Sequence, residues 1–298
     1  MSQSDIIPAY RTKESFGDMD IVYSTYTDEP LDTSDILKAF PGTGEITRNG
    51  SILSFEYNEL QVDLIHSTGV CYGYALDYFS WNDLGNLIGR IAHKFGLKHG
   101  HRGLLLPVRD GDNLVSEIVL TTNYSRTLTF LGFDVIDFYK GFNTLNEIFQ
   151  YVATSENFNP EFYKLENLNT IARTRDRKRV SYNSFLKFID ALDSVKYPEP
   201  SPDKSQYLVK IFQAFPAARQ QFDDIIKSLM IKKLVKQRFN GCLISEYTAL
   251  TGKELGVFMR SIKNNPMFSD SFILCMSDET IRKNIIECYT KYKEHNEQ

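Results

Sequence analysis

Two aspartates at the head of an apolar run constrain this 298-residue chain more than any other feature. They are Asp18 and Asp20, and Ile21, Val22 and Tyr23 follow them. In a strand, residues i and i+2 point to the same face, so we expect both carboxylates to project into one pocket. Adjacent carboxylates repel each other and are costly to desolvate unless a cation lies between them. Because a lone pair of this kind is common in turns and caps, a metal site requires a further acid.

Asp63 is that further acid, and it lies inside a strand-like run at residues 60–66. An acid in an apolar strand is costly without a partner. If a neighbouring strand places Asp63 beside Asp18 and Asp20, the three carboxylates form the hard oxygen ligand set that Mg²⁺ prefers. Two metal ions about 3.5–4 Å apart can bind the attacking and the leaving oxygens of an in-line displacement. The sequence therefore predicts a site for two Mg²⁺ ions, with Mn²⁺ as an alternative.

The residues around these acids resemble a known family. The segments that carry the resemblance are residues 14–20, 62–65, 74–80, 83–90, 94–98, 102–105, 142–149 and 158–161. They are similar to the palm and thumb of family X DNA polymerases, in the polymerase-beta-like nucleotidyltransferase superfamily, over about residues 8–165. The resemblance implies an α+β fold with a mixed-sheet palm. It also implies metal-dependent transfer of a nucleoside monophosphate from an NTP or dNTP to a nucleic-acid 3′-hydroxyl, with release of pyrophosphate.

The resemblance further implies roles for single residues. Asp18, Asp20 and Asp63 are the expected catalytic and metal-binding residues, with Asp63 helping to activate the primer hydroxyl. The expected nucleotide-binding residues are Arg11, Gly17, Tyr78, Phe79, Asp83 and Asn86. Arg90 is expected to reach the minor groove on the template side.

The sequence departs from the family pattern where the triphosphate and the primer are held. Ile7 and Pro8 replace the usual Gly-Ser pair, and a proline has no N–H to offer a phosphate. Phe16 replaces a serine, Gln61 a basic residue and Trp81 a glycine. The N-terminal lyase module of the family is also expected to be missing. The three metal-binding acids are unaffected by these departures.

Two polar features have an ordinary and a functional interpretation. Asp83, Asn86 and Arg90 share one face of a predicted helix over residues 82–96, which is either a solvated face or a nucleotide-facing one. A basic run surrounds a single acid and consists of Arg173, Arg175, Arg177, Lys178 and Arg179. Such runs are often solvated surface, but beside a polymerase-like palm the run is a candidate contact to a phosphate backbone.

Hydrophobic periodicity and turn signals indicate the remaining elements. Asn49-Gly50 is a hairpin signal, the acids of residues 110–112 form a turn, and Pro198, Pro200 and Pro202 mark the clearest linker. Strands are predicted at residues 51–57, 60–66, 103–108 and 115–120, and helices at about 35–40, 82–96, 144–155, 217–239 and 277–294. We expect a palm at residues 1–125, a thumb-like section at 126–180 and a helical C-terminal domain at 181–298.

Composition limits the class of protein. The formal net charge is −4, which is not the overall signature of a nucleic-acid binder, so local basic patches would have to bind the acceptor. The four cysteines form no C-x-x-C pair, which favours reduced thiols over a disulfide framework or zinc site. With no signal peptide or apolar run near 18 residues, we expect no membrane association. The expected location is the cytoplasm, or the host cytoplasm if a virus encodes the chain.

Two alternatives to a DNA polymerase stay open. Residues 239–259 are weakly similar to a helical segment of CCA-adding tRNA nucleotidyltransferases, which favours a terminal transferase acting on tRNA or RNA; a simple helix pair joined by a glycine turn explains the same residues. The other alternative is a non-catalytic polymerase-like module that binds nucleic acid or protein. The intact set of three acids argues against it, because unused clustered carboxylates cost stability.

Overall fold

The computed structural model describes residues 2–192, 197 and 200–296, so Pro198 of the expected linker lies outside the described residues. The fold is α+β, as the sequence predicts. Its strands are β1 Gln3–Ile6, β2 Asp18–Ser24, β3 Thr47–Asn49, β4 Ile52–Tyr57, β5 Leu60–His66, β6 Lys98–Gly100, β7 Gly103–Asp110 and β8 Asn113–Thr121. The described helices up to residue 214 are α1 Thr33–Ala39, α2 Tyr72–Phe79, α3 Leu84–Lys94, α4 Tyr124–Phe130, α5 Val135–Lys140, α6 Leu145–Ala153, α7 Thr170–Asp176, α8 Val180–Asp190 and α9 Tyr207–Ala214. Those of residues 217–296 are α10 Ala217–Arg238, α11 Gly241–Thr248, α12 Gly252–Ile262, α13 Asp270–Cys275 and α14 Asp278–Asn296.

The chain divides into two compact units, residues 1–219 and 220–298. We expected the helical C-terminal domain to begin at residue 181, but α8 and α9 belong to the first unit. The reason is aromatic packing within that unit. Phe185 of α8 packs against Phe149 with ring centroids 5.1 Å apart, and Phe215 after α9 packs against Phe130 at 5.2 Å.

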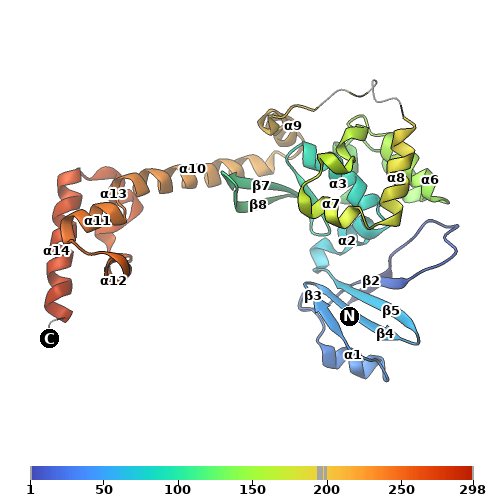
Figure 1. Cartoon of the computed structure of the whole chain (residues 1–298), viewed down its shortest axis with the longest axis horizontal. Helices are drawn as coiled ribbons and strands as arrows, with labels where there is room; N and C mark the ends of the chain where they lie inside the picture. Colours follow the sequence, from blue (N-terminus) through green and yellow to red (C-terminus); the bar gives the residue numbers. More distant parts are fainter. Residues whose placement is uncertain (1, 193–196, 198–199, 297–298) are drawn as a thin grey trace. The chain divides into compact units, whose positions relative to one another are not determined.

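A mixed five-stranded sheet forms the N-terminal part of the first unit, in the order β1-β2-β5-β4-β3 (Figure 1). β2 and β5 run parallel, while the other pairs are antiparallel. The predicted hairpin at Asn49-Gly50 is confirmed, and Gly50 has the positive φ of 60° that such a tight turn requires. The strands predicted at residues 51–57 and 60–66 are confirmed as β4 and β5.

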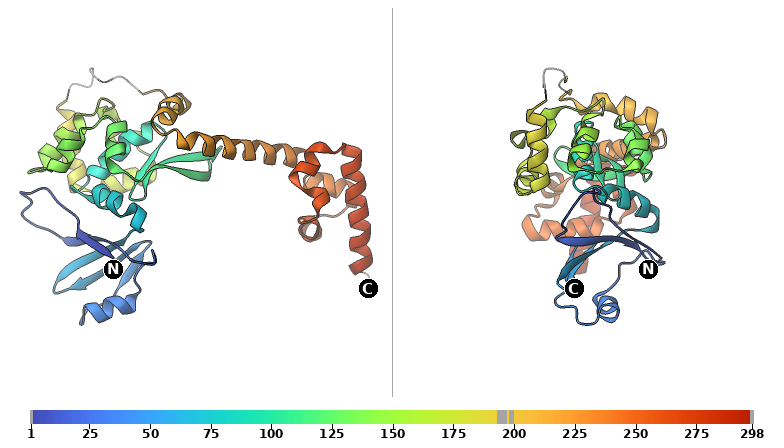
Figure 2. Two further views of the ribbon diagram at one scale, coloured as in Figure 1. Left: turned by 180° about the vertical axis from the view of Figure 1, so that it is seen from behind. Right: turned by 90° about the vertical axis from the view of Figure 1, so that its right-hand side faces the viewer.

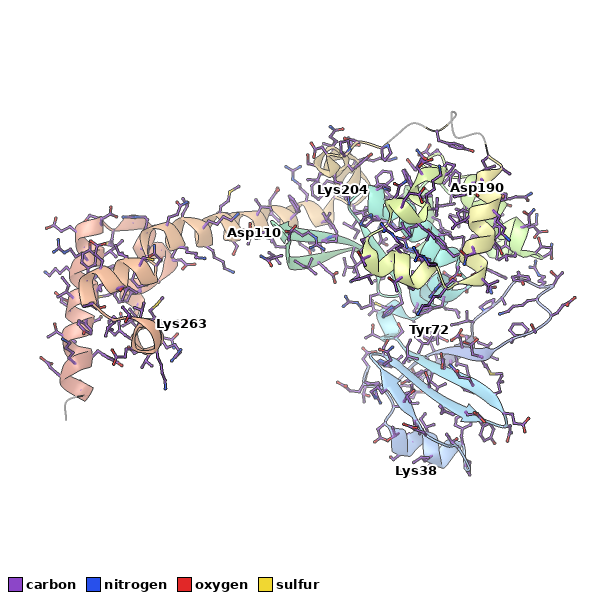
Figure 3. The ribbon with its side chains drawn as sticks, viewed as in Figure 1. Lys38, Tyr72, Asp110, Asp190, Lys204 and Lys263 are labelled. Atoms are coloured by element: carbon purple, nitrogen blue, oxygen red, sulfur yellow. The ribbon has the colours of Figure 1, made fainter. Side chains whose placement is uncertain are left out.

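The two faces of this sheet are covered by different helices. On one face, Tyr23, Leu53 and Leu64 pack against Ile36 of α1. On the other face, Val22 and Ile65 pack against Tyr72 and Ala75 of α2. Figure 2 shows the sheet and α1 from behind. Tyr72, labelled in Figure 3, lies where α2 meets the sheet and donates a hydrogen bond to Asp5 at 2.6 Å.

Helices and a second sheet complete the first unit. β6, β7 and β8 form an antiparallel sheet whose β7–β8 turn confirms the predicted hairpin. The helix predicted at residues 82–96 is confirmed as α3, and Gly96 follows it with a positive φ of 78°. Thr144 caps α6 as predicted, accepting a hydrogen bond from the Glu147 N–H at 3.2 Å.

The second unit, residues 220–298, is helical and has its own core. That core is built from side chains of α11 to α14, with Phe258, Ile273 and Ile285 fully buried at its centre. The long helix predicted at residues 217–239 is confirmed as α10. The division between the two units falls within its first turn. In the described part of the chain, none of the helices combines the length and the apolar character that crossing a bilayer requires.

Candidate metal centre and adjoining pocket

The strand register brings the three predicted acids together. Asp20 of β2 lies directly beside Asp63 of β5 in the parallel ladder, and Asp18 lies beside Gln61. Asp18, Asp20 and Asp63 each have a carboxylate oxygen within 4.8 Å of the others. They share the sheet face of Val22 and Ile65, two residues further along each strand. The acids therefore stand at the end of a face that α2 covers further along.

Burial and the two neighbouring acids of the cluster raise the cost of ionising Asp20, as the pKa of this residue shows. Burial, then the charges of Asp18 and Asp63, raise the pKa of Asp20 from 3.8 to about 6, and Lys13 opposes this rise. Gln61 donates a hydrogen bond to the Asp63 carboxylate at 3.0 Å, which fixes one of its oxygens. Three carboxylates on rigid strands fit a hard divalent cation by their donor chemistry. These residues can therefore hold a metal ion.

A loop at residues 7–17 connects β1 to the acids and is fixed at several points. The Ile7 N–H donates to the Asp20 carbonyl at 3.0 Å, and Pro8 accepts from the Trp81 N–H at 2.8 Å. The N–H groups of Arg11 and Thr12 donate to the carbonyls of Phe142 and Asn143. The loop therefore ties the acidic end of β2 to the start of α3 and to the segment before α6.

A pocket of about 720 Å³ opens beside this loop. The loop forms one wall with Tyr10, Thr12, Lys13, Glu14 and Ser15. The remaining wall comes from the start of three helices and consists of Asn82, Asp83, Leu145, Arg179, Val180 and Ser181. Loop residues thus line the pocket a few residues before the chain reaches the acids.

Most of the other expected nucleotide-binding residues lie outside this lining. Asp83 is part of it, whereas Arg11 is turned away and donates to the Lys140 carbonyl at 2.5 Å and to Asn143 at 3.1 Å. The ring of Tyr78 meets His99 edge-on at 5.0 Å, and Phe79 stacks on His101 at 5.8 Å. Gly17 is exposed directly before Asp18.

Most residues expected to contact nucleic acid instead bind other groups of the chain. Arg90 donates to Asp176, whose side chain is fully buried. Arg175 donates to Asn86 at 2.7 Å and also to Asp176. Arg179 donates to Asp83, as does the hydroxyl of Ser181.

Arg173 completes this internal use of the basic run. Its guanidinium donates to the carbonyls of Leu165, Glu166 and Leu168. Arg177 and Lys178 are exposed. The polar face of α3 and the basic run are thus each other's partners, which the sequence could not reveal because they lie far apart along the chain.

Sequence reasoning missed Lys13, which both lines the pocket and acts on Asp20. A single lysine in a polar loop has no distinctive pattern. Its position in the sequence was the one available signal, because Arg11 and Lys13 are the two cations between Pro8 and Asp18. Comparison of the chain with protein-family models and with curated proteins gives no match.

Proposed function

We propose that this chain is a metal-dependent nucleotidyltransferase, which transfers a nucleoside monophosphate from an NTP or dNTP to a nucleic-acid 3′-hydroxyl and releases pyrophosphate. The observation that carries the proposal is the clustering of Asp18, Asp20 and Asp63 on two parallel strands, with carboxylate oxygens within 4.8 Å of one another. The resemblance to the palm of family X DNA polymerases includes the same three residues.

The three acids have separate tasks in this reaction. Asp18 and Asp20, two residues apart on one strand, would hold the cations together, and Asp63 would hold a cation for the acceptor hydroxyl. Bound Mg²⁺, or Mn²⁺ in its place, neutralises charge on the attacking and leaving oxygens. The raised pKa of Asp20 supports this assignment, since strongly perturbed carboxyls cluster at functional sites.

The adjoining pocket is the proposed site for the nucleotide. It borders the loop that leads into Asp18, so a nucleotide held there would have its phosphates near the acids. Asp83, which the resemblance places beside the incoming base, lines its far wall. The volume of about 720 Å³ is within the range of small-molecule sites, about 300–1,000 Å³.

One observation favours an RNA or tRNA terminal transferase over a template-directed DNA polymerase. Arg90, which the resemblance assigns to the template side, is engaged by Asp176 and only 14% exposed. The cytoplasm is the proposed compartment, because all four cysteines are free thiols, as in a reducing environment.

The test is nucleotide transfer by the purified full-length chain. Each labelled NTP and dNTP is offered with Mg²⁺ and one of three acceptors: primed DNA, single-stranded RNA or tRNA trimmed of its CCA end. We expect extension that Asp63→Ala abolishes without loss of folding, because Asp63 is a ligand and not a core residue. The preferred acceptor separates a DNA polymerase from a terminal transferase.

Three results would count against the proposal. Turnover retained in Asp63→Ala would remove that residue from the mechanism. Absence of transfer to every acceptor, with metal binding intact, would move the reaction to a protein or small-molecule acceptor. Absence of both transfer and metal binding would favour a non-catalytic binding module.

A further inference from the structure

We infer that Lys13 is the residue that binds the triphosphate of the nucleotide, in the pocket that borders the loop leading into Asp18. The inference rests on the proposed function for the reaction that uses this nucleotide. It assigns to a loop lysine the task that the family pattern gives to groups this chain has replaced at Ile7, Pro8 and Phe16.

Lys13 is the available cation of the loop at residues 7–17. Arg11, the other cation, directs its guanidinium to the Lys140 carbonyl and the Asn143 side chain. Among the described residues, Lys13 forms no ion pair; its ammonium lies 4.5 Å from the centre of the Phe16 ring. That contact is weak enough to be exchanged for a phosphate, because cation–π pairs at exposed sites are weaker than charge-assisted hydrogen bonds.

The backbone of the loop offers exposed, unengaged donors just after Lys13. Pro8 has no N–H, and the N–H groups of Arg11, Thr12 and Lys13 donate to the carbonyls of Phe142, Asn143 and Tyr10. The N–H groups of residues 14–16 have no acceptor within the described chain, and these residues are exposed. An anion bound at this end of the loop would therefore meet the Lys13 ammonium and free amides together.

The position of Lys13 connects the pocket to the acids. Its side chain lines the pocket, and the loop that carries it runs directly into Asp18, the first of the three acids. A polyphosphate lying between these two places would be bound by Lys13 on one side and by metal-bound carboxylates on the other. Lys13 is thus a binding residue for the phosphates and not a metal ligand.

The charges around the pocket indicate that polyphosphate binding requires a divalent cation. The charged residues of the pocket lining cancel, with Lys13 and Arg179 opposing Glu14 and Asp83. The three acids at the end of the loop add further negative charge, so a polyphosphate that reaches them is repelled until cations neutralise them. We therefore expect polyphosphate binding that depends on both Mg²⁺ and Lys13.

The experiment is calorimetric titration of the full chain with inorganic tripolyphosphate and with ATP, each in the presence of Mg²⁺. The loss of one charge-assisted contact is expected to weaken binding of both ligands by about ten-fold or more in Lys13→Ala. Lys13→Arg should restore most of the affinity. Lys187→Ala, a change at an exposed lysine of α8 away from the pocket lining, should bind as the wild type does.

Where transfer activity is found, the same change should raise KM for the nucleotide with a smaller effect on kcat, because Lys13 binds the ground state and the transition state alike. A merely structural role would instead lower the melting temperature, which is measured alongside. Equal affinities of Lys13→Ala and the wild type for tripolyphosphate would overturn the inference. So would a lack of tripolyphosphate binding by the wild type.

The inference and the proposed function fail in different ways. Transfer that is lost in Asp63→Ala but has an unchanged KM in Lys13→Ala would keep the function and reject Lys13. Lys13-dependent binding of tripolyphosphate without transfer to any acceptor would keep the phosphate site and reject the proposed reaction.

Discussion

At the scale of single residues, Asp20 carries the clearest mark of a functional site. It is partly buried, lies beside Asp63 in the sheet and is raised in pKa to about 6 by burial and by its acidic neighbours. Natural chains keep such unfavourable charge clusters mainly where binding or catalysis uses them. The repulsion at Asp20 should therefore lower the free energy of unfolding by a measurable amount.

Replacing Asp20 by Asn should stabilise the metal-free protein at pH 8. Between pH 3.8 and about 6 the folded state holds more protons at Asp20 than the unfolded chain, so the free energy of unfolding falls as pH rises through this range. The repulsion that Asn removes is thus fully present above pH 6. We expect a gain of about 1–2 kcal/mol at pH 8, allowing for solvent screening, and little gain at pH 4.5.

Urea denaturation in EDTA at the two pH values measures this difference. Asp112→Asn, at an exposed turn, is the matched control and should change stability equally at both. Destabilisation of Asp20→Asn at pH 8 would contradict the repulsion.

Among single residues, the sequence allowed prediction of those whose role follows from their spacing along a strand. Asp18 and Asp20 could be placed on one face because strand residues alternate, and Asp63 could be paired with them because an acid in an apolar strand needs a partner. Lys13 could not be found in this way, since its role depends on which neighbouring donors are already engaged by Phe142, Asn143 and Lys140.

At the scale of elements, α3 is fixed by two different kinds of contact. Its polar face pairs with the basic run around α7, through Arg90 and Asp176 in particular. Its other side packs closely on α2, where a Cβ added at Gly85 would lie 2.1 Å from the Tyr78 carbonyl oxygen. Both contacts help to position Asp83 at the pocket.

Removing the buried carboxylate of Asp176 should strongly destabilise the first unit. Asp176→Ala leaves Arg90 nearly buried without its counter-charge, and breaking such a pair costs about 3–5 kcal/mol. Chemical denaturation measures the loss. Arg177→Ala, at the exposed neighbouring position, should change stability by less than about 0.5 kcal/mol. Equal effects of the two changes would show that the pair does not stabilise the fold.

A matched glycine pair tests the packing of α2 on α3. Gly85→Ala should cost about 1–3 kcal/mol, because the added methyl group meets the Tyr78 backbone. Gly89→Ala, where the nearest atoms are 3.9 Å away, should be neutral or stabilising by up to about 1 kcal/mol, since alanine favours the helix. Thermal unfolding ranks the two variants, and the reverse order would refute the close approach.

The elements themselves were largely predictable, and their partners were not. The Asn49-Gly50 hairpin, α3 and α10 follow from local turn residues and periodicity. The basic run around α7 was expected as solvated surface or a nucleic-acid contact, but four of the six cations expected to contact nucleic acid bind groups of the chain itself. Pairings across this sequence distance follow from the tertiary fold and leave no local pattern.

At the scale of the whole molecule, the chain consists of two units with separate cores. The division after Arg219 was not predictable, because prolines at 200 and 202 are typical of a linker, whereas Phe215 beyond them packs on Phe130 of the first unit. The second unit is organised around Phe258, Ile273 and Ile285. Separate cores predict that each unit can lose stability on its own.

Phe258→Ala should lower the stability of the second unit by about 3–5 kcal/mol, because it empties part of that core. Hydrogen exchange read by mass spectrometry should then be faster in residues 220–296, with protection in the first unit unchanged. Phe185→Ala in the first unit is the matched control and should give the opposite pattern. Faster exchange throughout the chain in both variants would mean that the units unfold as one.

The most direct test of the central claim is the binding of Mn²⁺ to the full-length chain, followed by electron paramagnetic resonance. If Asp18, Asp20 and Asp63 form a metal centre, the wild type takes up Mn²⁺ saturably, and Asp18→Ala/Asp20→Ala binds it at least about ten-fold more weakly while remaining folded. Equal Mn²⁺ binding by the two proteins would contradict the metal centre and, with it, the proposed nucleotidyl transfer.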